Sequence, residues 1–150
     1  MPEYGLPSGT KGLLPWKWAE QRLLSSHNYW LATTRPDGTP HAMPLWGIWF
    51  ENKFYFSTGR KSRKAKNLVA NPRCVVCTEK SHEAVVLEGV AREVKDAALI
   101  RLLGQPYKKK YPPWKLDPKM GPIFEVRPRL IFGLDEKKTL NSATRWKFPD

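Results

Sequence analysis

The sequence holds few of the residues from which metal sites and nucleophilic active sites are made. Its 150 residues include two cysteines and three histidines, and the histidines are scattered along the chain. It has no His-Glu-x-x-His stretch, no serine nucleophile elbow and no evident pair of carboxylates for acid–base catalysis. The glycine-rich loops that hold nucleotide phosphates in many enzymes are missing as well. We therefore expect no metal site and assign no catalytic residue.

The two cysteines, Cys74 and Cys77, have the spacing of a redox or zinc motif. The surrounding pattern, PRCVVCTE, is typical of a β-strand, in which residues three positions apart point to opposite faces. A dithiol motif would need the start of a helix, and a zinc site would need two more ligands. We interpret both cysteines as reduced structural thiols.

Long hydrophobic runs and acidic residues are also scarce. No segment approaches the roughly 18 apolar residues of a membrane span, and the N-terminal segment lacks the apolar core of a secretory signal. We expect a cytoplasmic protein that makes no use of a membrane. Lys and Arg number 26 against 14 Asp and Glu, which gives a formal charge of +12. Such a charge indicates an anionic partner, either a nucleic acid, an acidic membrane or an anionic small molecule.

What the sequence does have is a distinctive stretch over residues 54–72, FYFSTGRKSRKAKNLVANP. An apolar run predicts a strand, which the small residues Ser57, Thr58 and Gly59 end. Ser62 is a plausible N-cap of a following helix, whose apolar residues recur at helical spacing until Asn71 and Pro72 stop it.

Five cations lie within seven residues at the start of this predicted helix: Arg60, Lys61, Arg63, Lys64 and Lys66. The free N–H groups of a helix start already favour an anion, and cations placed there oppose the helix dipole. The crowding therefore predicts a bound anion, with a phosphate as the best candidate and the Thr58 and Ser62 hydroxyls as further donors. The alternative is a solvated basic turn.

The remaining pattern predicts one mainly β domain over residues 15–150, after an extended arm over residues 1–14. A helix should begin at Pro15, and an antiparallel meander should follow, with a second strand over 41–50 that Pro44 and Gly47 interrupt and place at an edge or bulge. Further strands are expected over 73–78, 84–94 (with a bulge at Gly89) and 123–134, a helix over 97–103, a Pro- and Lys-rich irregular segment over 105–121 and a short tail over 141–148. About six strands and two or three helices suggest a small closed or nearly closed barrel.

The order of these motifs resembles one known family. The segments YWLATTRPDGTPHAMPLWGIW, FYFSTG, SRKAKNL, NPR, VVLEGVARE and TRWKF resemble the pyridoxamine 5′-phosphate oxidase-like split-barrel family, also called the flavin/deazaflavin oxidoreductase superfamily. The resemblance runs from about Trp16 to Phe148. It implies an antiparallel split β-barrel, a homodimer with two cofactor sites at the subunit interface, and FMN or the deazaflavin coenzyme F-420 as cofactor.

The resemblance also implies which residues bind the cofactor. Thr58, Ser62, Arg63 and Lys64 match the family's phosphate-binding positions, and Ser57 lies beside them. Residues 43–46 match the strand whose backbone lines the isoalloxazine ring, namely Met43, Pro44, Leu45 and Trp46. Arg145 and Trp146 match a tail position, and we expect the tail of one chain to close the pocket of its twofold mate.

The chain departs from the oxidases for which the family is named. Those enzymes carry an Arg where Met43 stands and a Lys where Ile48 stands, and their basic substrate-binding C-terminus is not evident here. We therefore expect an oxidoreductase that passes hydride to or from another, unidentified small molecule.

Two alternatives remain open from the sequence. A deazaflavin with an acidic glutamyl tail would give Lys108, Lys109 and Lys110, together with Arg60 and Lys61, an anionic partner to meet. A nucleic-acid-binding module is the other alternative, because the stretch PYKKKYPPWK interleaves aromatic residues with lysines in the manner of single-strand binding. We favour it less, because the cations concentrate at the predicted phosphate site.

Overall fold

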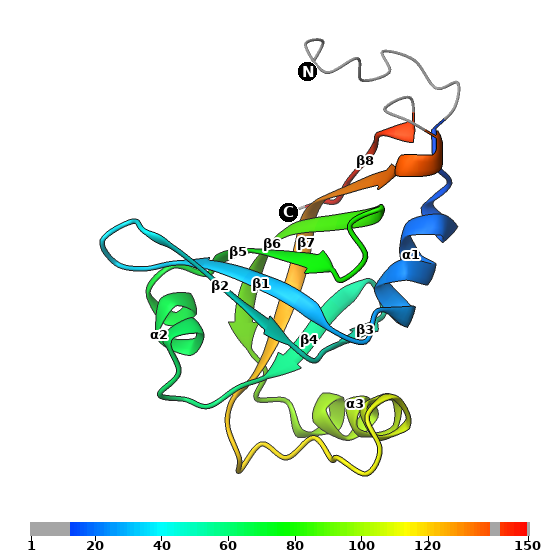
Figure 1. The fold of residues 1–150 in the computed structure, drawn as a ribbon. Helices are drawn as coiled ribbons and strands as arrows, with labels where there is room; N and C mark the ends of the chain where they lie inside the picture. The colour runs from blue at the N-terminus through cyan, green and yellow to red at the C-terminus, as the bar shows by residue number, and fades with distance from the viewer. Residues whose placement is uncertain (1–12, 139–141, 150) are drawn as a thin grey trace.

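The computed structural model describes residues 13–138 and 142–149, which form one antiparallel sheet of eight strands flanked by three α-helices (Figure 1). The structure is thus mainly β, as expected, with two more strands than the sequence predicted. Residues 1–12 of the predicted N-terminal arm lie outside the described residues. Leu14, at the end of that predicted arm, is buried, and its N–H donates to Oγ1 of Thr144 at 2.9 Å.

The first half of the chain builds both edges of the sheet. Its elements are α1 (Trp16–Ser25), β1 (Tyr29–Thr34), β2 (Pro40–Leu45), β3 (Ile48–Phe50) and β4 (Lys53–Ser57). The turn between β1 and β2 is closed by the Gly38 N–H, which donates to the Arg35 carbonyl at 2.8 Å, and Gly38 has a φ of 89°. Glycine adopts such a positive φ without steric cost, which suits this tight turn.

The second half supplies the centre of the sheet and two helices. Its elements are α2 (Arg63–Ala70), β5 (Arg73–Thr78), β6 (Glu83–Glu93), α3 (Ala97–Lys110), β7 (Ile123–Asp135), a 3-10 turn (Glu136–Lys138) and β8 (Thr144–Lys147). The register of β6 against β7 shifts between Glu88 and Gly89, which confirms the predicted bulge.

The sheet curls because two residues join its opposite edges. Its strand order is β2-β1-β5-β6-β7-β4-β3, so β2 and β3 are the two ends of this path, while β8 pairs with β7 beside β4. Only Trp46 and Gly47 separate β2 from β3 in the sequence. Two residues span less than about 10 Å, so the two ends must come close together and the sheet forms a split barrel.

The strand expected over residues 41–50 is therefore two strands, and the expected continuous meander is wrong. Pro44 lies in β2, which pairs only with β1, and Gly47 lies after its end. Pro44 has no N–H for a second ladder, which suits this edge position. At Gly47 a Cβ would overlap the ring of Phe54, so the chain crosses between the edges where it has no side chain.

Helix α3 is longer than predicted, because it continues through Pro106 to Lys110. A proline removes the hydrogen bond to the carbonyl four residues earlier, here that of Leu102. Leu102 is 59% exposed, so water can satisfy that carbonyl. The three lysines fall in the last turn, where cations complement the helix dipole.

Two apolar clusters stabilise the barrel. The larger lies between α1, α2 and the sheet and includes Leu23, Leu31, Phe54, Leu87 and Ile131. The smaller lies under α3; its members are Ile48, Tyr55, Val94, Leu103, Tyr111 and Ile123. Among the described residues, no helix is long and apolar enough to cross a membrane.

Candidate functional site

The predicted phosphate turn connects β4 to α2 and has the expected cap. Ser62 is the N-cap of α2, and its Oγ accepts from the Ala65 N–H at 3.2 Å. The Thr58 Oγ1 lies 3.2 Å from the same Ser62 Oγ, so the two hydroxyls form a pair at the helix start. Gly121 packs closely against the Thr58 carbonyl, and a Cβ on Gly121 would overlap that carbonyl oxygen. This contact helps to fix the backbone of the turn.

The cations of this turn divide into two groups. Arg60 is held away from the hydroxyl pair by Glu93, to which its guanidinium donates two hydrogen bonds of 3.1 and 3.2 Å. Arg63 and Lys64 have no ion pair or side-chain hydrogen bond in the part of the chain that the structure describes. They follow Ser62 directly in the first turn of α2, so they are the cations available to an anion there.

The structure adds His41 to this region, although the sequence analysis had not placed it in the site. Burial of the ring, and then the charges of Arg35, Lys64 and Arg63, lower the pKa of His41. Its Nδ1 is buried and has no hydrogen-bond partner among the described residues. His41 belongs to β2, so its coupling to Arg63 and Lys64 joins β2 to the start of α2. No local pattern in the sequence could have found a pairing between these two elements.

The four predicted ring-lining residues lie along the edge strand β2 and its exit. Met43 is 44% exposed and Pro44 is exposed, while Leu45 packs against the larger apolar cluster. Trp46 is half-buried and stacks on Tyr111, with ring centroids 4.6 Å apart and an interplanar angle of 5°. The outer edge of β2 pairs with no other described strand, so backbone groups are available there.

Arg145 and Trp146 lie elsewhere in the same chain. They belong to β8, which pairs with β7, and Trp146 packs edge-on against Trp16 with a centroid distance of 5.5 Å. Figure 1 shows β8 at the top of the sheet and α2 at its left, well apart from each other. The structure therefore does not bring the tail residues to the phosphate turn within one chain, and their role in a twofold mate stays a prediction.

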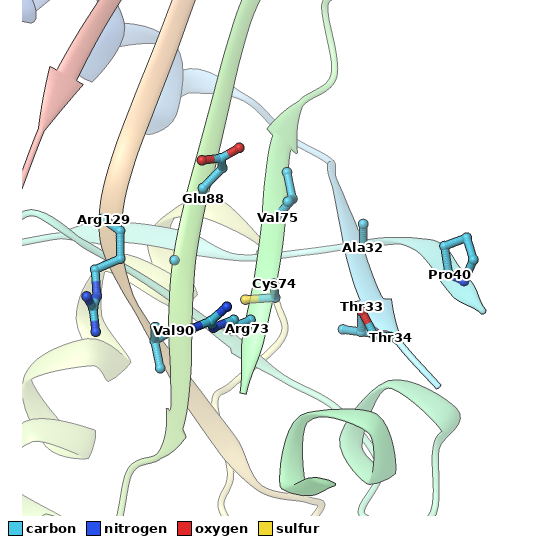
Figure 2. A pocket seen from close by; sticks show the side chains of 11 residues that line it. Ala32, Thr33, Thr34, Pro40, Arg73, Cys74, Val75, Glu88, Val90 and Arg129 are labelled. Atoms are coloured by element: carbon cyan, nitrogen blue, oxygen red, sulfur yellow. The ribbon is translucent and has the colours of Figure 1, made fainter. Parts of the chain in front are cut away.

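A cavity of about 460 Å³ lies on the sheet near β1 and α2 (Figure 2). Most of its lining residues alternate with those of the core, so it faces away from the barrel interior. The lining residues are Ala32, Thr33, Thr34, Pro40, Arg73, Cys74, Val75, Glu88, Gly89, Val90 and Arg129. This outward face was not predicted, although Arg73, Val75 and Cys77 alternate with buried residues along β5 and could have indicated it.

The Lys- and aromatic-rich segment does not present one continuous basic surface. Lys108 and Lys109 are exposed, but the Lys110 Nζ turns inward and donates to the Tyr29 hydroxyl at 2.6 Å. Tyr111 is only 2% exposed, whereas Trp114 is 60% exposed. The interleaved aromatic and basic side chains that single-strand binding would use are therefore not displayed together.

The cysteines lie in β5 as expected, and both are free thiols. Burial raises the pKa of Cys74 to about 12 and also raises that of Cys77. Neither thiol is therefore suited to act as a nucleophile at neutral pH. Within residues 13–138 and 142–149, no group of three or more His, Cys, Asp or Glu side chains could hold a metal ion.

Solved structures share this fold. General Stress Protein 26 from Bacillus anthracis is 19% identical over 88% of this chain and 97% of its own, with a TM-score of 0.69. A conserved hypothetical protein from Mycobacterium tuberculosis is 23% identical over 88% of this chain and 92% of its own, with a TM-score of 0.71. An F420 reductase is 27% identical over 75% of this chain and 94% of its own, with a TM-score of 0.60.

Comparison of the sequence with curated proteins found no match. Comparison with protein families found one, described as pyridoxamine 5′-phosphate oxidase, over residues 17–133. The match extends from α1 into β7 and includes the hydroxyl pair, the first turn of α2 and the edge strand β2. The chain therefore belongs to the pyridoxamine 5′-phosphate oxidase family and has its split-barrel fold.

Proposed function

We propose that this protein is an oxidoreductase that binds a flavin-type cofactor by its phosphate at the start of α2. The observation that carries the proposal is the pair of Thr58 and Ser62 hydroxyls, 3.2 Å apart, followed directly by Arg63 and Lys64. Hydroxyl donors, free helix N–H groups and two cations without acidic partners are the contacts that a phosphate needs. Ser57 ends β4 on the same turn and is half-buried.

Each part of the chain has a distinct task in this proposal. Thr58, Ser62, Arg63 and Lys64 hold the phosphate, and the edge of β2 from Met43 to Trp46 offers backbone groups and apolar side chains to the ring. A flavin or deazaflavin supplies hydride transfer when bound, so the protein need not provide a nucleophile or a metal. This division agrees with the absence of a catalytic motif in the sequence. The substrate would be a small molecule other than pyridoxamine phosphate, because Met43 and Ile48 stand where the oxidases carry Arg and Lys.

We propose further that the protein is a homodimer paired through the outward face of β1, β5 and β6. Trp30 on this face is 51% exposed, and its neighbour in register is Cys77. Ala32, Val75 and Val90 line the cavity of Figure 2 on the same side. A sheet whose second face also carries exposed apolar side chains favours a partner, and a second copy would bury this face symmetrically. In such a dimer Arg145 and Trp146 would approach the site of the mate.

The cofactor is either FMN or the deazaflavin coenzyme F-420. FMN needs only the phosphate turn and the ring-lining strand. The likeness to an F420 reductase at 27% identity is the observation that favours the deazaflavin. The structure reduces the set of cations for an acidic tail, because Arg60 is paired with Glu93 and Lys110 is turned inward, which leaves Lys61, Lys108 and Lys109.

A competition titration tests the proposal. The purified protein is titrated with FMN and with coenzyme F-420, and the fluorescence of each cofactor reports binding at low and at moderate salt. We expect one of the two cofactors to bind with a Kd below tens of micromolar. A glutamyl tail that contacts lysines would make the deazaflavin affinity salt-dependent. The absence of binding by both cofactors would reject the proposal, and salt-dependent binding of single-stranded nucleic acid instead would favour the nucleic-acid alternative.

A further inference from the structure

The link between β2 and β3 is held by the end of α3. The Gly47 N–H donates to the Tyr111 hydroxyl at 3.0 Å, and the Gly47 carbonyl accepts from the Lys110 Nζ at 3.0 Å. Both backbone polar groups of Gly47, one of the two residues that cross between the sheet edges, are thus bound by two consecutive side chains.

These two side chains have further hydrogen-bond partners that fix them. The Tyr111 hydroxyl lies 2.7 Å from the His27 carbonyl and 2.9 Å from that of Gly47, and can donate its one proton to either. The Lys110 Nζ also donates to the Tyr29 hydroxyl at 2.6 Å and lies 4.6 Å from the centroid of the Tyr29 ring. Tyr29 is fully buried, so Lys110 is anchored on the core of the barrel.

The same tyrosine also orients Trp46. The rings of Trp46 and Tyr111 are stacked, and the imidazole of His27 meets both rings edge-on, at 5.8 and 5.1 Å. Trp46 is bonded to Gly47, so the hydrogen bonds that fix the Gly47 peptide also fix the backbone from which the indole projects.

We propose that Lys110 and Tyr111 are positioning residues that set the orientation of Trp46 toward the cofactor ring. The inference rests on the proposed function, since Trp46 is one of the ring-lining residues. Helix α3 lies outside the phosphate turn and the edge strand. In this proposal its C-terminal end nevertheless controls the geometry of the site. The consequence is that cofactor affinity depends on side chains that do not touch the cofactor.

The test uses the full-length protein labelled with 5-fluorotryptophan. The seven tryptophans give seven fluorine resonances, and that of Trp46 is identified by its loss in Trp46→Phe. Tyr111→Phe keeps the stacked ring but leaves the buried Gly47 N–H without an acceptor. Lys110→Met keeps most of the side-chain length but removes both hydrogen bonds of the amine. Tyr107→Phe and Arg101→Met are the matched controls on the same helix, because Arg101 is exposed and lies outside the proposed cofactor contacts.

We expect Tyr111→Phe and Lys110→Met to shift or split the Trp46 resonance and to weaken cofactor binding about tenfold. Trp114 also contacts Trp46, so only the five other tryptophans should keep their resonances in place. The two controls should change neither quantity. An unchanged Trp46 resonance in both variants overturns the inference, as does a shifted resonance with unchanged cofactor affinity. If Tyr111→Phe fails to fold, Lys110→Met decides. If the wild-type protein binds neither cofactor, the proposed function fails, and the resonance alone decides whether α3 positions Trp46.

Discussion

The backbone N–H of Gly47 donates to the hydroxyl of Tyr111, which lies 64 positions further along the chain. Gly47 is where the chain passes from one edge of the sheet to the other, and Tyr111 is the C-cap of α3. One hydrogen bond therefore ties the closure of the barrel to the end of a helix outside it. Disturbing either residue should affect both the stability of the barrel and the ring-lining strand.

Gly47→Ala should lower the free energy of unfolding by about 1–3 kcal/mol, because the new Cβ would overlap the Phe54 ring and approach the Tyr55 carbonyl to 2.9 Å. Gly104→Ala is the matched control. Gly104 lies within α3, a Cβ there meets nothing within 4 Å, and alanine should stabilise the helix by about 0.5–1 kcal/mol. Urea denaturation measures the free energy of unfolding of both variants. Equal changes in Gly47→Ala and Gly104→Ala would contradict the tight crossing at Gly47.

Ser62 serves two roles that can be separated by two substitutions. Ser62→Ala removes the cap on the Ala65 N–H and should lower stability by about 1 kcal/mol while also weakening cofactor binding. Ser62→Asp keeps a good cap, so stability should stay near wild type, but its carboxylate should repel the phosphate and abolish binding. Thermal unfolding and cofactor titration of the same samples provide the two readouts. Normal binding by Ser62→Asp would place the phosphate elsewhere.

His41 should report an anion at the start of α2. Burial, followed by Arg35, Lys64 and Arg63, lowers its pKa below 6.5, so its protonation opposes folding as the pH falls through that value. A phosphate bound between these cations would offset their charge and raise the pKa of His41. NMR titration of the three imidazoles, with and without cofactor, measures the change, and His82 on the β5–β6 turn serves as the reference. If the cofactor binds and the pKa of His41 does not change, the phosphate is not bound at the start of α2.

A composite dimer site predicts complementation between two defective variants. Lys64→Ala should weaken cofactor binding about 10- to 100-fold through loss of a charge-assisted contact, and Arg145→Gln should weaken it through the tail of the mate. Lys147→Gln, also exposed on β8, is the control.

Mixed dimers of Lys64→Ala and Arg145→Gln chains should contain one intact site and one doubly altered site. About half of the dimers are mixed at equal concentrations if pairing is random, so a quarter of all sites should regain wild-type affinity. Titration of the refolded mixture against each pure variant measures this. If no sites regain wild-type affinity, either both residues belong to the site of one chain or Arg145 is not part of the site.

Lys110 should make stability depend on pH. Burial is the main cause that lowers its pKa to about 8, from 10.5 in an unfolded chain, although the charge of Glu79 acts in the opposite direction. The unfolded chain therefore binds more protons between these values, and the stability should rise as the pH increases above about 8.

In Lys110→Met, the stability should no longer rise as the pH increases above about 8. Burial also raises the pKa of the neighbouring Tyr111 to about 12 and raises that of Tyr29, so neither phenol titrates in the folded protein near pH 8. Urea denaturation of both proteins between pH 7 and 9.5 isolates the contribution of Lys110, with Lys109→Met as the control. Parallel curves for the wild type and Lys110→Met would contradict a buried amine.

The local elements could be predicted from the sequence, because their causes are local. The strand Tyr29–Thr34, the helix capped by Ser62 and the bulge at Gly89 follow from residue type and spacing within a few positions. Thr58 and Ser62 were predicted together as hydroxyl donors for the same reason, since they flank a single turn, and the structure places their hydroxyls 3.2 Å apart.

Tertiary structure alone decided which distant residues meet. Helix α3 continues through Pro106 where the helix is exposed, as at Leu102, and this exposure depends on how the helix packs. Lys110 turns inward because the buried Tyr29 hydroxyl and the Gly47 carbonyl accept from its amine, and both lie more than 60 positions away. The charges of Arg63 and Lys64 lower the pKa of His41 because the fold places the edge strand β2 near α2. Spacing along the chain determines helices, strands and caps, whereas the environment of a charge depends on which elements the closed barrel packs around it.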